Sequence, residues 1–385
     1  MANFSRHVRL SNKRSQLVGV ISVLFSIHKF PSKYLMSIGP AMLYYRSPNN
    51  KLNEEIIMQA AVIREPGGPE MFEIQTLPDP VPGPDEVLVE IKATALNRAD
   101  LAQRHGNYPA PVGIRDDIPG LEMAGIIIGV GERVVGWEEG DRVMALLGGM
   151  GYATHIAVHE RMLMPVPEGL SFEEAAGIPE VYLTAYDAMH LQCELVMGEV
   201  ALIHAAGSGV GTAAVQLAAA QSCLTFGTAG SDSKLEKAKE LGLDVGINYN
   251  SQNFREVVME VTGGNGADVI LDVIGAPYWD DNVRSLATLG RLVLVGAMGG
   301  GTLDQAKLGA LGNKRAIVRG TRLRSRTFEE KATVVQGFAK RILPLFARGK
   351  LQSIVDHVFP LNEVAAAHSY METNVNFGKI ILVND

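Results

Sequence analysis

From residue 181 onward, short apolar runs alternate with longer segments of helical periodicity. Strands of a covered parallel sheet are apolar on both faces, and the helices that connect them are amphipathic. This alternation predicts a parallel α/β sheet covered on both faces, with enough strands for a complete dinucleotide-binding unit. The predicted strands lie at residues 200–204, 224–228, 245–247, 268–273, 291–295 and 316–320. The predicted helices lie at residues 210–221, 233–241, 254–261 and 279–289.

The chain on either side of this region has a different pattern. In residues 58–180, short β-like runs such as 87–93, 124–130 and 142–145 are separated by Pro and Gly clusters, which is typical of a mostly antiparallel β domain. Residues 321–385 contain a helical run at 328–347, end in a strand-like run at 378–383, and are expected to return to the first domain. The prediction is a β-rich domain, residues 58–180 and 321–385, with an inserted six-stranded parallel α/β domain, residues 181–320.

The first 57 residues do not fit this pattern. Residues 1–53 contain no Asp or Glu but many basic and serine residues, which is typical of an organelle transit peptide. The apolar run at 17–27 resembles a secretory signal but is shorter than the roughly 20 residues that span a membrane. We rank a transit peptide first, an untranslated or wrongly joined leader second and a secretory signal third. The folded part is expected to begin at Met58, in the cytoplasm or in an organelle, with no membrane span.

Composition narrows the function classes. A chain of 385 residues exceeds the roughly 250–300 residues of a single core, so two domains are expected. A net charge of -7 and a pI near 5.8 leave no general basic surface, so nucleic acid is not an expected partner. Two cysteines, Cys193 and Cys223, are too few for a disulfide framework or a structural zinc lobe.

A glycine-rich turn follows the first predicted strand of the parallel region and opens its first helix. Glycines allow a sharp turn and a close approach of the backbone to phosphate, and the helix N-terminus presents unpaired N–H groups. An ordinary tight turn is the alternative, and the six-strand context favours the phosphate site. The residues predicted to bind the phosphates of a dinucleotide are Gly207, Ser208, Gly209, Val210 and Gly211.

The residues at the end of the second predicted strand indicate whether the dinucleotide is NAD or NADP. NAD sites usually place an acidic residue there, whereas this chain has Ser231 and then Lys234, which suit the extra phosphate of NADPH. Asp232 is the contrary residue, because an inward-pointing Asp232 would favour NAD. Lys234 is alternatively a solvated charge in the first turn of a helix. Tyr249, after the third strand, lies either against the adenosine or in the core.

The run from Ile203 to Ala218 (IHAAGSGVGTAAVQLA) resembles the cofactor turn of the medium-chain dehydrogenase/reductase superfamily, quinone oxidoreductase branch. The similarity continues through residues 97–100 (NRAD), 228–231 (TAGS), 247–249 (INY), 271–275 (LDVIG) and 323–326 (LRSR), and covers residues 58–385. Jointly these motifs are similar to the zinc-independent NADPH quinone reductases related to zeta-crystallin, especially the stress-inducible subgroup. The resemblance implies a GroES-like β domain with an inserted Rossmann domain, NADPH in the cleft between them, and a homodimer.

The resemblance also implies roles for particular residues. Ser231, Lys234 and Tyr249 would hold the adenosine and its phosphate, and Asn97 and Tyr108 would approach the nicotinamide and the substrate. A further group would line the nicotinamide and ribose side of the cleft, with structural roles in turns and strands as the alternative. This group is Gly296, Ala297, Met298, Leu323, Arg324 and Asn376.

Zinc-dependent relatives carry a Gly-His-Glu motif, and this chain has Leu121 at the position of the histidine. Leucine cannot bind a metal, and neither His204 nor His105 has partners at ligand spacing, so no metal site is predicted. Without a Lewis acid, the site suits acceptors that are already electrophilic, such as quinones or activated alkenes, and the cofactor supplies the difficult chemistry. Tyr108, Asn97 or water would supply a proton. Asp100 is either an acid of the site or, equally well, an anchor of a helix or turn.

Three functions compete on this basis. The first is NADPH-dependent reduction of quinones. The second is NADPH-dependent reduction of α,β-unsaturated carbonyls, which the same metal-free cleft would accommodate. The third is a nucleotide-binding protein with negligible turnover, as the recruitment of relatives as crystallins suggests.

Overall fold

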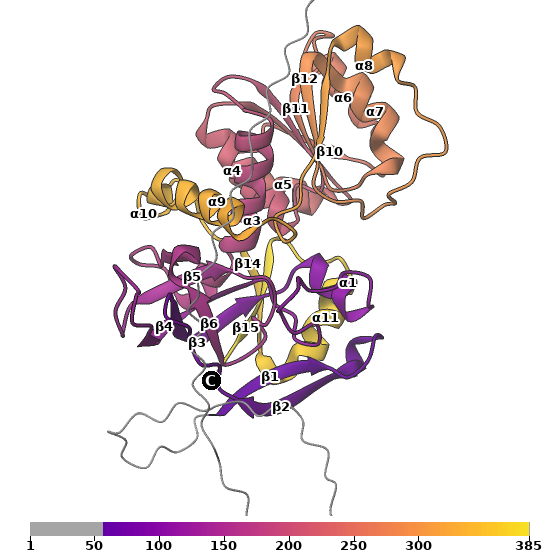
Figure 1. Cartoon of the computed structure of the whole chain (residues 1–385). Helices are drawn as coiled ribbons and strands as arrows, with labels where there is room; N and C mark the ends of the chain where they lie inside the picture. Colours follow the sequence, from indigo (N-terminus) through magenta and orange to yellow (C-terminus); the bar gives the residue numbers. More distant parts are fainter. Residues whose placement is uncertain (1–56, 385) are drawn as a thin grey trace, which may run out of the picture. The chain divides into compact units, whose positions relative to one another are not determined.

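The computed structural model describes residues 57–384 (Figure 1). The predicted leader therefore lies outside the described residues, except for Ile57. Strand β1 (Ile57–Ile63) begins at that residue and pairs antiparallel with β2 (Phe72–Pro78). Within the described part of the chain, no helix is long and apolar enough to cross a membrane.

The predicted parallel sheet is confirmed, with the strand order β10-β9-β8-β11-β12-β13. Every neighbouring pair in it is parallel. The order reverses between β8 and β11, and doubly wound sheets bind dinucleotides beyond the carboxyl ends of the strands at such a point. The strands are β8 (Val200–Ile203), β9 (Leu224–Ala229), β10 (Val245–Asn248), β11 (Ala267–Asp272), β12 (Leu286–Leu294) and β13 (Ile317–Gly320).

Helices connect these strands, and polar caps fix where several of them begin. Ser208 and Ser231 accept hydrogen bonds from backbone N–H groups one turn later, which satisfies donors that have no partner within the helix. The predicted helix at 279–289 is too long, because Leu286 leaves the helix to pair with Ala267 of β11. The helices are α4 (Gly209–Ala220), α5 (Asp232–Glu240), α6 (Phe254–Val261), α7 (Trp279–Ser285) and α8 (Gly309–Lys314).

The predicted β-rich domain is also confirmed. Its main sheet has the order β14-β15-β3-β4-β5-β7, with β6 paired to β3. All of its pairs are antiparallel except β14 with β15. Along β3, buried residues alternate with partly buried ones, as expected for a strand with one face on the core. The strands are β3 (Glu86–Ala95), β4 (Glu122–Val130), β5 (Arg142–Leu146), β6 (His155–His159), β7 (Leu163–Pro165), β14 (Val355–Pro360) and β15 (Lys379–Val383).

The end of the chain returns to the β-rich domain, as expected. Strand β15 pairs with β3, with Ile381 opposite Ala95. The predicted helical run at 328–347 is two helices, α9 (Phe328–Arg341) and α10 (Pro344–Ala347), because Pro344 lacks an N–H and begins a new helix. The insertion of the parallel sheet is therefore established, and its boundaries at residues 180 and 320 stay a prediction.

Helix α3 (Pro179–Tyr186) connects the two sheets. Its Tyr182 donates a hydrogen bond to the carbonyl oxygen of Gln352 at 2.7 Å and accepts one from Gln216 of α4 at 2.8 Å. One continuous buried cluster contains side chains of α3 and of both sheets. The start of α3 is therefore held firmly beside the first helix of the parallel domain. The remaining α-helices of the described residues are α1 (Arg98–Arg104), α2 (Phe172–Ala176) and α11 (Val364–Glu372).

Candidate functional site

The glycine-rich turn connects β8 to α4. At Gly211 the helix lies directly on the strand, since a Cβ atom here would be 2.1 Å from the carbonyl oxygen of Ala205. The Oγ of Ser208 accepts a hydrogen bond from the Gly211 N–H at 3.0 Å. The N–H groups of Gly209 and Val210, the first two residues of α4, have no acceptor within the helix. Two free donors at the positive end of a helix suit a pyrophosphate.

Residues near the C-terminus lie against this turn. The N–H of Gly378 donates to the carbonyl oxygen of Gly207 at 3.0 Å. A Cβ atom at Gly207 would lie 3.2 Å from the ring of Phe377. The side chain of Asn376 donates to the carbonyl oxygen of Gly378 at 3.0 Å. The structure therefore brings Asn376 to the turn, although the two are far apart in sequence.

The residues predicted to bind adenosine lie beyond the end of β9. Ser231 caps α5 by accepting a hydrogen bond from the Lys234 N–H at 3.4 Å. The Nζ of Lys234 donates to the carbonyl oxygen of Asn374 at 2.6 Å, so this lysine is anchored rather than freely solvated. Tyr249 is 48% exposed, which rules out a core role, and a Cβ atom at Gly230 would be 2.4 Å from its hydroxyl oxygen.

Two further cations lie beside Lys234, and together we call Arg98, Lys234 and Lys237 the cation cluster. Arg98, the first residue of α1, donates to the side-chain oxygen of Asn374. Burial lowers the pKa of Lys234, and the charges of Arg98 and Lys237 lower it further, against an opposing effect of Asp356. Positive charges close enough to lower one another's pKa create a positive potential, which attracts an anion. Sequence reasoning missed Arg98, because nothing in its local pattern indicates that α1 lies near α5.

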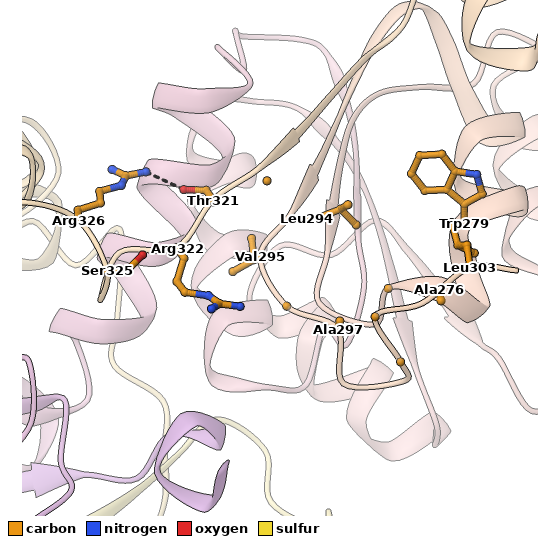
Figure 2. A pocket seen from close by; sticks show the side chains of 15 residues that line it. Ala276, Trp279, Leu294, Val295, Ala297, Leu303, Thr321, Arg322, Ser325 and Arg326 are labelled. Atoms are coloured by element: carbon orange, nitrogen blue, oxygen red, sulfur yellow. Dashed lines mark hydrogen bonds between the residues drawn. The ribbon is translucent and has the colours of Figure 1, made fainter. Parts of the chain in front are cut away.

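A cavity of about 660 Å³ opens at the carboxyl ends of β11, β12 and β13 (Figure 2). Of the residues predicted for the nicotinamide side, Gly296 and Ala297 line it, whereas Met298, Leu323 and Arg324 do not. Figure 2 shows charged and polar side chains toward one end of the cavity and apolar side chains toward the other. The polar end has Thr321, Arg322, Ser325 and Arg326, and the apolar end has Trp279 and Leu303.

Tyr108 borders the polar end of this cavity. The guanidinium of Arg322, a cavity residue, lies 5.4 Å from the centre of the Tyr108 ring, and that of Arg324 lies 4.8 Å from it. Arg324 also donates to the carbonyl oxygens of Gly148 and Tyr108, at 2.9 and 3.1 Å, and to the side chain of Gln103 at 2.6 Å. Through these contacts, Arg324 holds the segment after β13 against the loop that contains Tyr108.

Asn97 belongs to a hydrogen-bonded set that we call the buried network, with Glu122 and Lys379. The Nζ of Lys379 lies 2.8 Å from both the Glu122 carboxylate and the side-chain oxygen of Asn97. The side-chain amide of Asn97 donates to the same carboxylate at 2.9 Å. The Lys379 and Glu122 side chains are 4% and 0% exposed. The network meets the glycine turn, because a Cβ atom at Gly209 would be 2.8 Å from the Lys379 side chain.

Asp100 is an anchor, the second of the two roles open from the sequence. It is fully buried and accepts hydrogen bonds from the N–H groups of Asn97 and Gly120, at 2.8 and 3.2 Å, and from the Tyr152 hydroxyl at 3.1 Å. Burial raises its pKa to about 6 despite these donors. The three hydrogen bonds fix the start of α1, and with it the positions of Asn97 and Arg98.

Comparison with known proteins identifies the family. The alcohol dehydrogenase GroES-like domain matches residues 83–168, and the zinc-binding dehydrogenase domain matches residues 209–340. A quinone oxidoreductase of Pseudomonas aeruginosa is 32% identical over 82% of this chain and 97% of its own. The synaptic vesicle membrane protein VAT-1 homolog of Homo sapiens is 31% identical over 85% of this chain and 86% of its own. The chain belongs to the medium-chain dehydrogenase/reductase superfamily.

Solved structures of this superfamily share the fold. CurK enoyl reductase superposes with a TM-score of 0.77 at 28% identity, over 85% of this chain and 99% of its own. The architecture is that of a nicotinamide-dependent oxidoreductase of the medium-chain dehydrogenase/reductase superfamily. The glycine turn, the cation cluster and the cavity follow one another around the carboxyl ends of its parallel strands, where that cofactor binds in doubly wound sheets.

The resemblance places Leu121 where zinc-dependent relatives have a histidine, and the structure buries this side chain. Leu121 is 1% exposed and has no metal-binding atom. Among residues 57–384, no group of three or more His, Cys, Asp or Glu residues is arranged to hold a metal ion. His204 is a core residue bonded to Thr228 at 3.1 Å and Asn282 at 2.6 Å, and burial lowers its pKa to about 4.

Proposed function

We propose that this member of the superfamily is an NADPH-dependent quinone reductase that works without zinc. The observation that carries the cofactor assignment is the convergence of Arg98 and Lys234 on Asn374, beside the capping residue Ser231. NADPH differs from NADH by a 2′-phosphate, and cations offset that charge by charge-assisted hydrogen bonds. The contrary residue, Asp232, is exposed and accepts a hydrogen bond from the Asn248 side chain at 2.7 Å.

The remaining donors fit the rest of the cofactor. The N–H groups of Gly209 and Val210 would hold the pyrophosphate, and Gly296 and Ala297 would face the nicotinamide half. When bound, NADPH supplies a hydride to the acceptor. The protein's own contribution is to hold cofactor and acceptor in a productive orientation, which accounts for much of the rate acceleration in reactions of this kind.

The residue at the zinc position limits the acceptors. Because Leu121 cannot position a metal to polarise a carbonyl group, the acceptor must already be electrophilic. Quinones meet this condition, and the name of the quinone oxidoreductase of Pseudomonas aeruginosa supports them. The cavity suits such a molecule, since Trp279 and Leu303 offer apolar surface and Arg322 offers hydrogen-bond donors.

Activated alkenes are the second candidate, favoured by the similarity to CurK enoyl reductase. A substrate panel separates the two. The full chain is assayed for NADPH oxidation with a series of quinones and a series of α,β-unsaturated carbonyls. Faster turnover of quinones supports the proposal, and quinone inactivity beside rapid enone turnover would replace it with the alkene reaction. NADPH binding without oxidation by any acceptor would favour a nucleotide-binding protein with negligible turnover.

We also propose that the protein is a homodimer, as the resemblance implies. Strand β13 is the last strand of the parallel sheet, so one of its edges has no partner strand among the described residues. Its Ile317 is 45% exposed. An edge strand with an exposed apolar side chain is suited to pairing with a second chain. Light scattering on the purified full chain tests this, and a monomer mass would overturn it.

A further inference from the structure

Glu180 is a titratable residue of this region with no role in the function so far. It is the second residue of α3, and its N–H donates to the Oε2 atom of Glu122 at 2.7 Å. Its own carboxyl group is partly buried and has no hydrogen-bond partner within residues 57–384. A carboxyl group in this position is free to bond a molecule that enters from outside the protein.

The surroundings of Glu180 connect the parts of the candidate site. The next residue, Val181, reaches the glycine turn, since a Cβ atom at Gly209 would be 2.9 Å from its Cγ1 atom. Glu122, which binds the Glu180 backbone, belongs to the buried network. The Glu180 carboxyl group also lies close enough to Tyr108 for its charge to raise the pKa of the tyrosine. Glu180 therefore lies among the cofactor turn, the buried network and the edge of the cavity.

The two neighbouring carboxyl groups have opposite environments. The Glu122 carboxylate is bonded to a lysine, to the Asn97 amide and to a backbone N–H. Burial and the negative charge of Glu122 raise the pKa of Glu180 to about 8, with Asp100 adding to the rise and Lys379 and Arg324 opposing it. At neutral pH, Glu180 is therefore a carboxylic acid beside a carboxylate. Such pairs divide into a proton donor and a charged partner in many active sites.

The other nearby groups are poorer sources of a proton. Both polar atoms of the Asn97 side chain are bonded within the buried network, and an amide is not an acid. Burial, with a contribution from Glu180, raises the pKa of Tyr108 above its usual value of 10.0, although Arg322 and Arg324 oppose this. A general acid works best when its pKa is near the operating pH. Glu180 meets this condition better than Tyr108 does.

We propose that Glu180 donates the proton that completes reduction of the acceptor, an inference that rests on the proposed function. Reduction leaves a negative charge on an oxygen atom of the acceptor. The O–H bond of the Glu180 carboxyl group breaks, its electron pair stays on the carboxylate, and the proton forms the new O–H bond of the product. The carboxylate then takes a proton from water, which restores the acid and balances the reaction. Glu122 holds the Glu180 backbone in place, and the charges of Glu122 and Lys379 act on its carboxyl group in opposite directions.

The test compares the wild type with Glu180→Gln, which keeps the size of the side chain but has no proton to give. We expect kcat/KM for the preferred acceptor to fall about 100-fold, the low end for a lost general acid. In the wild type, kcat/KM should fall as pH rises through about 8, and the variant should lack this limb. Glu180→Asp should restore part of the rate, and Glu240→Gln, an exposed residue of α5, serves as the matched control.

A second measurement does not depend on turnover. Infrared spectroscopy of the cofactor-free full chain follows the protonated carboxyl band as pH is raised. We expect a carboxyl group that loses its proton near pH 8 in the wild type and is missing in Glu180→Gln. The absence of such a group in the wild type would overturn the inference even if the enzyme reduces quinones. An active wild type with an equally active variant and the same pH profile would also overturn it. A wild type with no acceptor at all would instead overturn the proposed function.

Discussion

The cation cluster and the buried network begin at neighbouring residues but are built in opposite ways. Asn97 belongs to the buried network and Arg98 to the cation cluster, so the start of α1 serves both. In the buried network, Lys379 is 4% exposed and paired with a carboxylate. In the cation cluster, Lys234 is partly exposed, and among residues 57–384 its amine bonds to a carbonyl oxygen and to no carboxylate.

The difference shows how the same residue type is used for two purposes. A buried lysine with a carboxylate partner holds the fold together, because removal of either member leaves an uncompensated buried charge. A cation without such a partner costs little to remove, but it is available to an anionic ligand. The buried network should therefore affect stability and the cation cluster should affect binding.

The largest effect is expected from Lys379→Met. This change leaves the Glu122 carboxylate buried without its ion partner, and the free energy of unfolding should fall by about 3–5 kcal/mol. Lys239→Met removes an exposed ion pair with Glu236 and should change the free energy by less than about 1 kcal/mol. Urea unfolding of both variants measures the difference. Equal, small effects would show that the buried network does not carry stability.

A smaller effect, on binding alone, is expected from Lys234→Ala and Arg98→Ala. Each removes one cation from the proposed 2′-phosphate site, and each should weaken NADPH binding by about 10-fold to 100-fold. NADH binding should be unchanged, because NADH lacks that phosphate. Calorimetric titration with both cofactors measures the effect. Equal losses for NADPH and NADH would assign these residues to the shared part of the cofactor instead.

The third expected effect is a change of stability with pH. In the folded protein Glu180 keeps its proton until about pH 8, whereas in the unfolded chain it releases the proton near its usual value of 4.5. Raising the pH through this window therefore favours the unfolded state of the wild type. Glu180→Gln lacks this proton linkage, so its Tm relative to the wild type should be higher near pH 8 than near pH 4.5. A Tm difference that does not change with pH would contradict a raised pKa of Glu180 in the folded protein.

The parts of this fold that follow a local pattern were predictable. The six parallel strands and the glycine turn were predicted from patterns of residues adjacent in sequence. The end of α7 was not predictable, because Leu286 is set by its pairing with β11. Resemblance pointed to Asn97 and Tyr108, but nothing in the sequence joined Arg98 to Lys234.

The chemical role proposed for Glu180 was not predictable from the sequence either. Its position after Pro179 resembles an ordinary helix start, where an acidic residue favours the helix dipole. Its raised pKa comes from burial and from Glu122, which lies on a strand far away in the sequence. Tertiary packing created both the buried network and the acid beside it, so no local signal was available.

The measurement that tests the central claim most directly is the affinity of the full wild-type chain for NADPH and NADH under the same conditions. With Arg98 and Lys234 converging at the end of β9, NADPH should bind at least about 10-fold more tightly than NADH. Equal affinity for the two cofactors would contradict the assignment of this cluster to the 2′-phosphate.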